Sequence, residues 1–225
     1  MSGQKTCRGF LSGNALKLIA AASMLTDHVG LMFFPENLLL RIIGRLAFPI
    51  FAYMIAEGCR YTHDRRRYFF NLFGLAVVCQ IAYSLAGGEL YLSVLFTFSL
   101  SVLMIFSLQY CKEKPSAFPV LLFASAVAGV YVLNRLVDID YGFWGCMLPV
   151  FISLCQRKDQ RAAMLVLGLL LLALEQGGIQ FFSLAAIPLL LLYSGKRGKW
   201  KMKSFFYLFY PAHLALLQLI AWLTA

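Results

Sequence analysis

The chain has 225 residues, of which 61% are hydrophobic and only 13% are charged, and its formal net charge is +10. Soluble domains average roughly 45–50% apolar and about 25% charged residues, so this composition excludes an ordinary soluble domain and indicates a membrane protein. The six cysteines form no CxxC pair, and they predict neither a disulfide framework nor a zinc site.

Apolar segments follow one another along the chain. The first begins at Leu18 after a basic stretch, and because it contains Asp27 and His28 we interpret it as an uncleaved span and not as a signal peptide. As a helix, roughly 20 apolar residues cross the hydrocarbon layer. We therefore expect an all-α, polytopic transmembrane helix bundle that forms a single domain over residues 1–225. About nine spans are expected, near 16–34, 38–60, 68–86, 91–110, 118–136, 141–155, 161–175, 179–194 and 204–223, the sixth and seventh being short.

The basic residues agree with this count, since all but three of the 20 Lys and Arg residues fall in segments on one side. These segments contain Lys5, Arg8, Lys17, Arg60, Arg65, Arg66, Arg67, Lys112, Lys114, Arg157, Lys158, Arg161, Lys196, Arg197, Lys199, Lys201 and Lys203. The positive-inside rule places that side in the cytoplasm. We expect a cytoplasmic N-terminus and an inner-membrane location, with the lipid bilayer as partner. The basic charge then sets topology, and no nucleic-acid binding is expected.

Two charged pairs are expected at similar depth in the outer half of the first two spans. Asp27 and His28 lie in the first span, and Arg41 and Arg45, one helical turn apart, enter the second from its outer face. Charge at membrane depth is costly, so such residues usually lie in a protein interior and often mark function. One interpretation is a structural ion pair of Asp27 with an arginine. The other is a general base at His28, with Asp27 orienting the imidazole or holding Arg45.

A third polar position is Glu57, near the inner end of the second span. In an unbroken helix it would point away from Arg41, but Pro49 lies between them and can kink the helix. We expect Glu57 to pair with Arg60 or with another cation on the inner side.

A fourth polar cluster lies in the last span, where Tyr210 and His213 share one helix face at i, i+3 spacing beside Pro211. A histidine on an apolar face is commonly a hydrogen-bonded core residue. With a proline and a tyrosine nearby, His213 is also a second candidate for a catalytic base.

The stretches "LKLIAAASMLTDHVGLMFFPE", "LLLRIIGRLAFPIFAYMIAEGCRYT" and "FYPAHL", in this order, resemble the TraX family of integral membrane proteins, and "DYGFWG" resembles its mid-chain motif. The family is named for a conjugation protein that N-acetylates the amino terminus of pilin, and it is similar to wider membrane acyltransferases that use acyl-CoA. The resemblance thus implies an acetyltransferase with acetyl-CoA as co-substrate and no metal. The positions that match the family are Asp27, His28, Arg41, Arg45, Glu57, Tyr210 and His213.

Acyl transfer from a thioester needs a base that deprotonates the acceptor and donors that stabilise an oxyanion. We expect His28 to be the base, and Arg45 or Tyr210 to face the oxyanion. Basic side chains on the inner side are candidates for binding the CoA phosphates, although each is also explained as a topology determinant. These are Arg65, Arg66, Arg67, Lys199, Lys201 and Lys203.

Two other functions fit the same residues. In a proton-coupled transporter or flippase, Asp27 and His28 would relay protons, although the inverted repeat typical of such proteins is not visible in the sequence. In a non-catalytic membrane scaffold, the polar clusters would only hold helices together.

Overall fold

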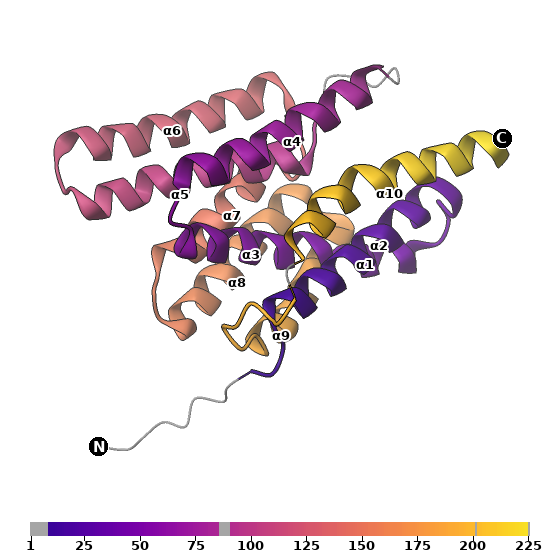
Figure 1. Ribbon diagram of the computed structural model, residues 1–225, viewed down its shortest axis with the longest axis horizontal. Coiled ribbons are helices and arrows are strands. Elements are labelled where there is room, and N and C mark those ends of the chain that lie inside the picture. The colour runs from indigo at the N-terminus through magenta and orange to yellow at the C-terminus, as the bar shows by residue number, and fades with distance from the viewer. Residues whose placement is uncertain (1–8, 86–90, 201, 225) are drawn as a thin grey trace. The chain divides into compact units, whose positions relative to one another are not determined.

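The computed structural model describes residues 9–85, 91–200 and 202–224, and in these it is almost entirely helical (Figure 1). This confirms the expected all-α class. The α-helices are α1 (Gly13–Phe33), α2 (Leu38–Gly44), α3 (Ala47–Tyr61), α4 (Arg65–Leu85), α5 (Val94–Glu113), α6 (Ala117–Leu136), α7 (Gly142–Leu154), α8 (Lys158–Gln176), α9 (Ala186–Leu191) and α10 (Lys203–Thr224). A 3₁₀ helix, η1 (Gly178–Ala185), precedes α9, and two-residue strands β1 (Tyr91–Leu92) and β2 (Asp138–Ile139) pair in parallel.

Five helical segments of the described chain are long and apolar enough to cross a membrane. They are Gly13–Phe33, Leu38–Tyr61, Val94–Glu113, Ala117–Leu136 and Ser204–Thr224. The other four segments expected to span are also helical, but α7 and the η1–α9 stretch are short. The seventh segment is longer than expected, since α8 has 19 residues. The count of nine spans therefore stays a prediction.

The second span is broken, but not where we expected the kink. Helix α2 ends at Gly44, a turn follows at Arg45 and Leu46, and α3 begins at Ala47. Pro49 lies in the first turn of α3, where its missing N–H costs no intrahelical hydrogen bond. The interruption therefore precedes the proline.

The chain forms two compact units, one of residues 1–51 and 182–225 and the other of residues 52–181. In the first unit, α1 packs against α2 and α10. The N-terminal N–H groups of α1 are bound by the loop before α10: Gly13 donates to the Lys196 carbonyl at 2.8 Å, and Asn14 donates to the Arg197 carbonyl at 2.9 Å. Such groups have no partner within their own helix. The basic loop and the start of α1 consequently lie at the same end of this unit, as the charge pattern predicts.

In the second unit, α5 packs against α4, α6 and α7, and α7 packs against α8. Small hydroxyl side chains of α5 reach neighbouring backbone. Ser101 Oγ donates to the Cys146 carbonyl at 2.7 Å, and Thr97 Oγ1 donates to the Asp140 carbonyl at 2.6 Å. These bonds satisfy the buried hydroxyls and tie α5 to the start of α7.

Candidate active site

Asp27 of α1 is held by two arginines, Arg41 of α2 and Arg45 of the turn that follows it. Arg41 Nη1 lies 2.9 Å from Asp27 Oδ2, and Arg45 Nη2 lies 2.6 Å from Asp27 Oδ1. The three side chains are between 12% and 22% exposed. Both carboxylate oxygens accept a charge-assisted hydrogen bond, so the sequence-level interpretation in which Asp27 anchors the arginines is the one the structure shows.

A glycine makes this close approach possible. A Cβ on Gly44 would lie 2.2 Å from Asp27 Oδ1 and 2.3 Å from Asp27 Cβ, and a Cβ on Gly30 would lie 2.7 Å from Leu40 Cβ. Any larger residue at Gly44 would therefore push α2 away from the carboxylate. Small residues at helix contacts are the usual way for membrane helices to pack closely.

His28 meets His213 of α10, with ring centroids 5.1 Å apart. His213 Nδ1 lies 2.8 Å from the Phe209 carbonyl, which can only accept, so Nδ1 carries the proton and Nε2 is an acceptor in the neutral ring. His28 Nδ1 lies 2.9 Å from the Met24 carbonyl and 3.2 Å from His213 Nε2. Because both partners are acceptors, the hydrogen-bonding pattern assigns the proton to Nδ1 of His28. Its Nε2 then keeps a lone pair that can take a proton.

Aromatic side chains fix the His213 ring. The Phe209 ring stacks on it with centroids 4.8 Å apart and an interplanar angle of 9°, and the Tyr210 ring meets it edge-on at 5.8 Å. His213 is only 5% exposed, whereas His28 is partly exposed. Of the two candidate bases, His213 is therefore the more enclosed and His28 the more accessible.

Glu57 belongs to the second unit and pairs there with Arg161 of α8. Arg161 Nη1 lies 2.5 Å from Glu57 Oε1, while Arg60 is 4.0 Å from the same oxygen. Both partners of the short pair are 5% exposed. Arg161 also donates from Nε to the Ile152 carbonyl, and its guanidinium lies 4.8 Å from the Tyr53 ring centroid.

Arg161 was predicted only as one of the cytoplasmic cations and not as a site residue. The available signal was Glu57, since a buried acid requires a buried cationic or hydrogen-bonding partner. The sequence could not say which of the inner cations supplied it. Of the two expected alternatives, Glu57 pairs with a cation other than Arg60, and Arg60 is the more distant neighbour.

The candidate phosphate-binding residues do not all belong to one unit. Arg65 pairs with Glu113 of α5, and Arg66 and Arg67 are exposed on the first turn of α4. Lys199 is exposed in the loop before α10. Lys201 lies outside the described residues, and Lys203 starts α10 with a side chain that is also outside the described part. The structure thus gathers Asp27, His28, Arg41, Arg45, Tyr210 and His213 in the first unit.

These contacts supply three chemical capacities: a histidine nitrogen that can accept a proton, a second histidine that orients it, and a carboxylate with two guanidinium groups beside it. Proton transfer and stabilisation of negative charge are the two requirements of acyl transfer. The same groups are also suited to conducting protons.

Comparisons with known proteins show the family to which the chain is similar. A family model described as "TraX protein" matches residues 12–221. The chain is 30% identical to "Probable fimbrial assembly protein FimC, serogroup H1" of Dichelobacter nodosus, over 90% of this chain and 92% of that protein. It is 28% identical to "Protein TraX" of Escherichia coli, over 92% of this chain and 86% of that protein. No solved structure matches it.

Proposed function

Because the chain belongs to the TraX family, we propose that it is a membrane-embedded acyltransferase. It transfers an acetyl group from acetyl-CoA to an amine or hydroxyl of a peptide, glycan or small acceptor. The observation that carries the proposal is the contact between two imidazoles, in which His213 Nε2 lies 3.2 Å from His28 Nδ1. Beside them is the Asp27 carboxylate with its two arginines.

The proposed reaction uses His28 Nε2 as the general base. It takes the proton of the acceptor amine or hydroxyl as that group attacks the thioester carbonyl carbon. The carbon–sulfur bond then breaks, the CoA thiolate leaves, and the imidazolium returns the proton to it. His213 and the Met24 carbonyl hold the Nδ1 side of His28, so that the ring presents Nε2 to the acceptor.

Negative charge develops on the carbonyl oxygen during attack, and two groups in the first unit are suited to it. Arg41 and Arg45 each bind Asp27 through a terminal nitrogen, and both guanidinium groups carry a positive charge. Tyr210 adjoins His213. We assign Arg45 or Tyr210 to the oxyanion and Asp27 to positioning the arginines.

The donor is proposed to enter from the cytoplasmic side of the inner membrane. Lys199 belongs to the same unit as the histidines and is the first candidate for binding the CoA phosphates, with Lys201 and Lys203 following it in sequence. Arg65, Arg66 and Arg67 of the second unit are the alternative. Nine spans with the N-terminus in the cytoplasm would place both groups on that side.

The names of the relatives support one acceptor class for a first test. One of them is named for fimbrial assembly, and the family resemblance implies N-acetylation of pilin subunits. We therefore propose the amino terminus of a surface-fibre subunit as the acceptor to test first. Its amine must be neutral to attack, which is the task assigned to His28.

The test uses the full chain purified in detergent with isotopically labelled acetyl-CoA and a peptide that carries the amino terminus of a fibre subunit. Mass spectrometry should detect label on the peptide amine with wild type and none with His28→Ala. A hydroxyl-bearing glycan and a small amine serve as parallel acceptors. If no acceptor is labelled, while protein in liposomes carries a proton flux that His28→Ala abolishes, the proton-coupled transporter is the function.

A further inference from the structure

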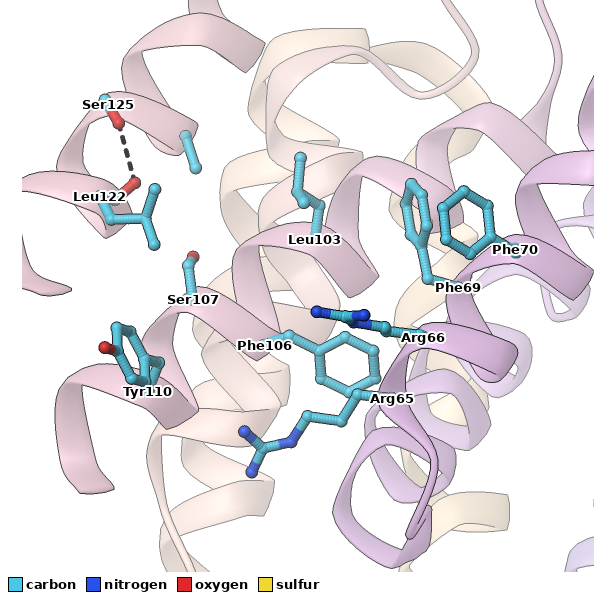
Figure 2. Close-up of a pocket in the computed structure, with 11 residues that line it drawn as sticks. Arg65, Arg66, Phe69, Phe70, Leu103, Phe106, Ser107, Tyr110, Leu122 and Ser125 are labelled. Atoms are coloured by element: carbon cyan, nitrogen blue, oxygen red, sulfur yellow. Dashed lines mark hydrogen bonds between the residues drawn. The ribbon is translucent and has the colours of Figure 1, made fainter. Parts of the chain in front are cut away.

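The second unit contains a groove of about 580 Å³, and none of its lining residues is assigned to proton transfer or to the oxyanion (Figure 2). Its floor is one face of α5, formed by Leu103, Phe106, Ser107 and Tyr110. These positions repeat at three- and four-residue spacing, which places them in one row along a helix. The row is about 10 Å long at 1.5 Å per residue.

The walls of the groove are α4 on one side and α6 on the other, since α5 packs against both helices. Phe69 and Phe70 come from α4, and Leu122, Ser125 and Ala126 come from α6. Phe70 is 65% exposed and Leu122 41% exposed. The lining is therefore mostly apolar and open to the side, which suits a hydrocarbon chain of the surrounding bilayer.

One end of the groove is cationic. Arg65 and Arg66 of α4 line it there, and Arg65 is already paired with Glu113. For Arg66, no ion pair is seen within the described ranges 9–85, 91–200 and 202–224. Figure 2 shows the Arg66 side chain extending from α4 toward α5, near Phe106. The guanidinium is available to an anion from outside the protein.

The groove is therefore positively charged at the end that Arg65 and Arg66 line. Further along, its lining is mainly aromatic and aliphatic. Arg66 stands at the start of α4, in the basic stretch that the positive-inside rule places at the cytoplasmic boundary. Basic sites between transmembrane helices on that side commonly bind lipid head groups. Volumes of roughly 300–1,000 Å³ are typical of small-molecule sites.

We infer that this groove binds an anionic phospholipid, with the head-group phosphate on Arg66 and the upper part of one acyl chain along α5 between α4 and α6. The inference does not depend on acyl transfer at the histidines, because no residue of the groove takes part in proton transfer or oxyanion stabilisation. It does compete with the alternative in which Arg65 and Arg66 bind the CoA phosphates. Acetyl-CoA also carries phosphates, but its long hydrophilic nucleotide portion does not fit a channel that is apolar over most of its length.

The experiment is native mass spectrometry of the full chain in detergent, titrated with phosphatidylglycerol or with phosphatidylcholine of the same acyl chains. Arg66→Gln should weaken phosphatidylglycerol binding about fivefold, as expected for one cation near a lipid head group. Arg67→Gln is the matched control, because Arg67 is the adjacent exposed arginine and does not line the groove. It should change the affinity little, and phosphatidylcholine should bind more weakly to wild type.

A second pair of variants tests the chain-binding channel. Ser125→Trp places a large ring in the groove and should abolish lipid retention, whereas Ala124→Trp, at the adjacent exposed position outside the lining, should not. Should Ser125→Trp fail to fold, the comparison of Arg66→Gln with Arg67→Gln tests the inference by itself. Equal losses in Arg66→Gln and Arg67→Gln would overturn the inference, as would normal retention by folded Ser125→Trp.

Two soluble competitors separate the sources of phosphate. Glycerol 3-phosphate, which has no acyl chain, should not displace the lipid at equal concentration. Displacement by it would show a plain phosphate site and overturn the inference. Acetyl-CoA should likewise leave the lipid in place. If it displaces the lipid and itself binds more weakly to Arg66→Gln, the groove belongs to the acyl donor and not to a phospholipid.

Discussion

The two histidines differ in which ring nitrogens form hydrogen bonds, and the proposed mechanism gives them different roles for that reason. His213 uses Nδ1 on the Phe209 carbonyl and Nε2 on His28, so both of its nitrogens have partners. His28 uses Nδ1 for both of its hydrogen bonds, to the Met24 carbonyl and to His213. In the proposed mechanism, His28 is therefore the residue that exchanges a proton with the acceptor, and His213 positions it.

His28→Ala should lower the rate of acetyl transfer by about 10²–10⁴, the usual contribution of a general base. His213→Ala should cause a smaller loss, because the Met24 carbonyl still holds His28 Nδ1. The measurement is single-turnover transfer to the acceptor peptide, with the melting temperature recorded for each variant. His63→Ala, in an exposed loop, is the control. A normal rate in His28→Ala with a large loss in His213→Ala would move the base to α10.

Asp27→Asn should destabilise the protein, because it leaves Arg41 and Arg45 as partly buried cations without a counter-charge. Removing one partner of a buried ion pair costs 3–5 kcal/mol, and with 12–22% exposure here we expect about 3 kcal/mol. Thermal unfolding in detergent measures the change. Glu36→Gln removes a nearby exposed carboxylate and should have little effect. Equal melting temperatures for both variants would contradict a stabilising role for the Asp27 pair.

At the scale of elements, the close contact between α1 and α2 depends on Gly44, which has no side chain. Gly44→Ala would place a methyl group within 2.5 Å of three Asp27 atoms, so α2 must move or Asp27 must leave its arginines. Overpacking of this kind typically costs 1–3 kcal/mol. Gly129→Ala in α6 is the matched control, since its Cβ would meet open space and alanine favours a helix by up to about 1 kcal/mol. The melting temperature should therefore fall in Gly44→Ala and rise in Gly129→Ala. A higher melting temperature in Gly44→Ala would refute the close contact.

A buried ion pair between Glu57 and Arg161 joins α3 to α8. Arg161→Met should destabilise the second unit by about 3–5 kcal/mol, because Glu57 would remain buried without its cation. The double variant Glu57→Met with Arg161→Met should recover most of that loss, since no buried charge then remains. Arg60→Gln is the control, because Arg60 is the more distant neighbour and is 40% exposed. A double variant as unstable as Arg161→Met would show that the pair itself stabilises the unit.

For the whole molecule, the number of spans decides which side each loop faces. With nine spans, Ser116 between α5 and α6 is cytoplasmic and Asp138 after α6 is external. If only the five long apolar helices cross, both positions change sides. Single cysteines at Ser116→Cys and Asp138→Cys, in a chain without its native cysteines, should be labelled by a membrane-impermeant reagent at Asp138→Cys alone. Labelling at Ser116→Cys alone would support five spans.

The sequence by itself determined the all-α class, the membrane character and most of the polar residues of the candidate site. These follow from local rules, because a charge in an apolar run is conspicuous and residues three or four apart share a helix face. Arg41 and Arg45 could therefore be assigned to one face that Asp27 was expected to meet, and the structure shows both contacts.

The tertiary structure alone decided which distant residues meet. His28 and His213 are 185 positions apart, and Glu57 and Arg161 are 104 apart. It also showed that the second span is interrupted at Arg45, ahead of Pro49. No helical period relates positions on different helices. Their contacts depend on how whole surfaces pack, on glycines such as Gly44 that let backbones approach, and on the need of every buried charge for a partner.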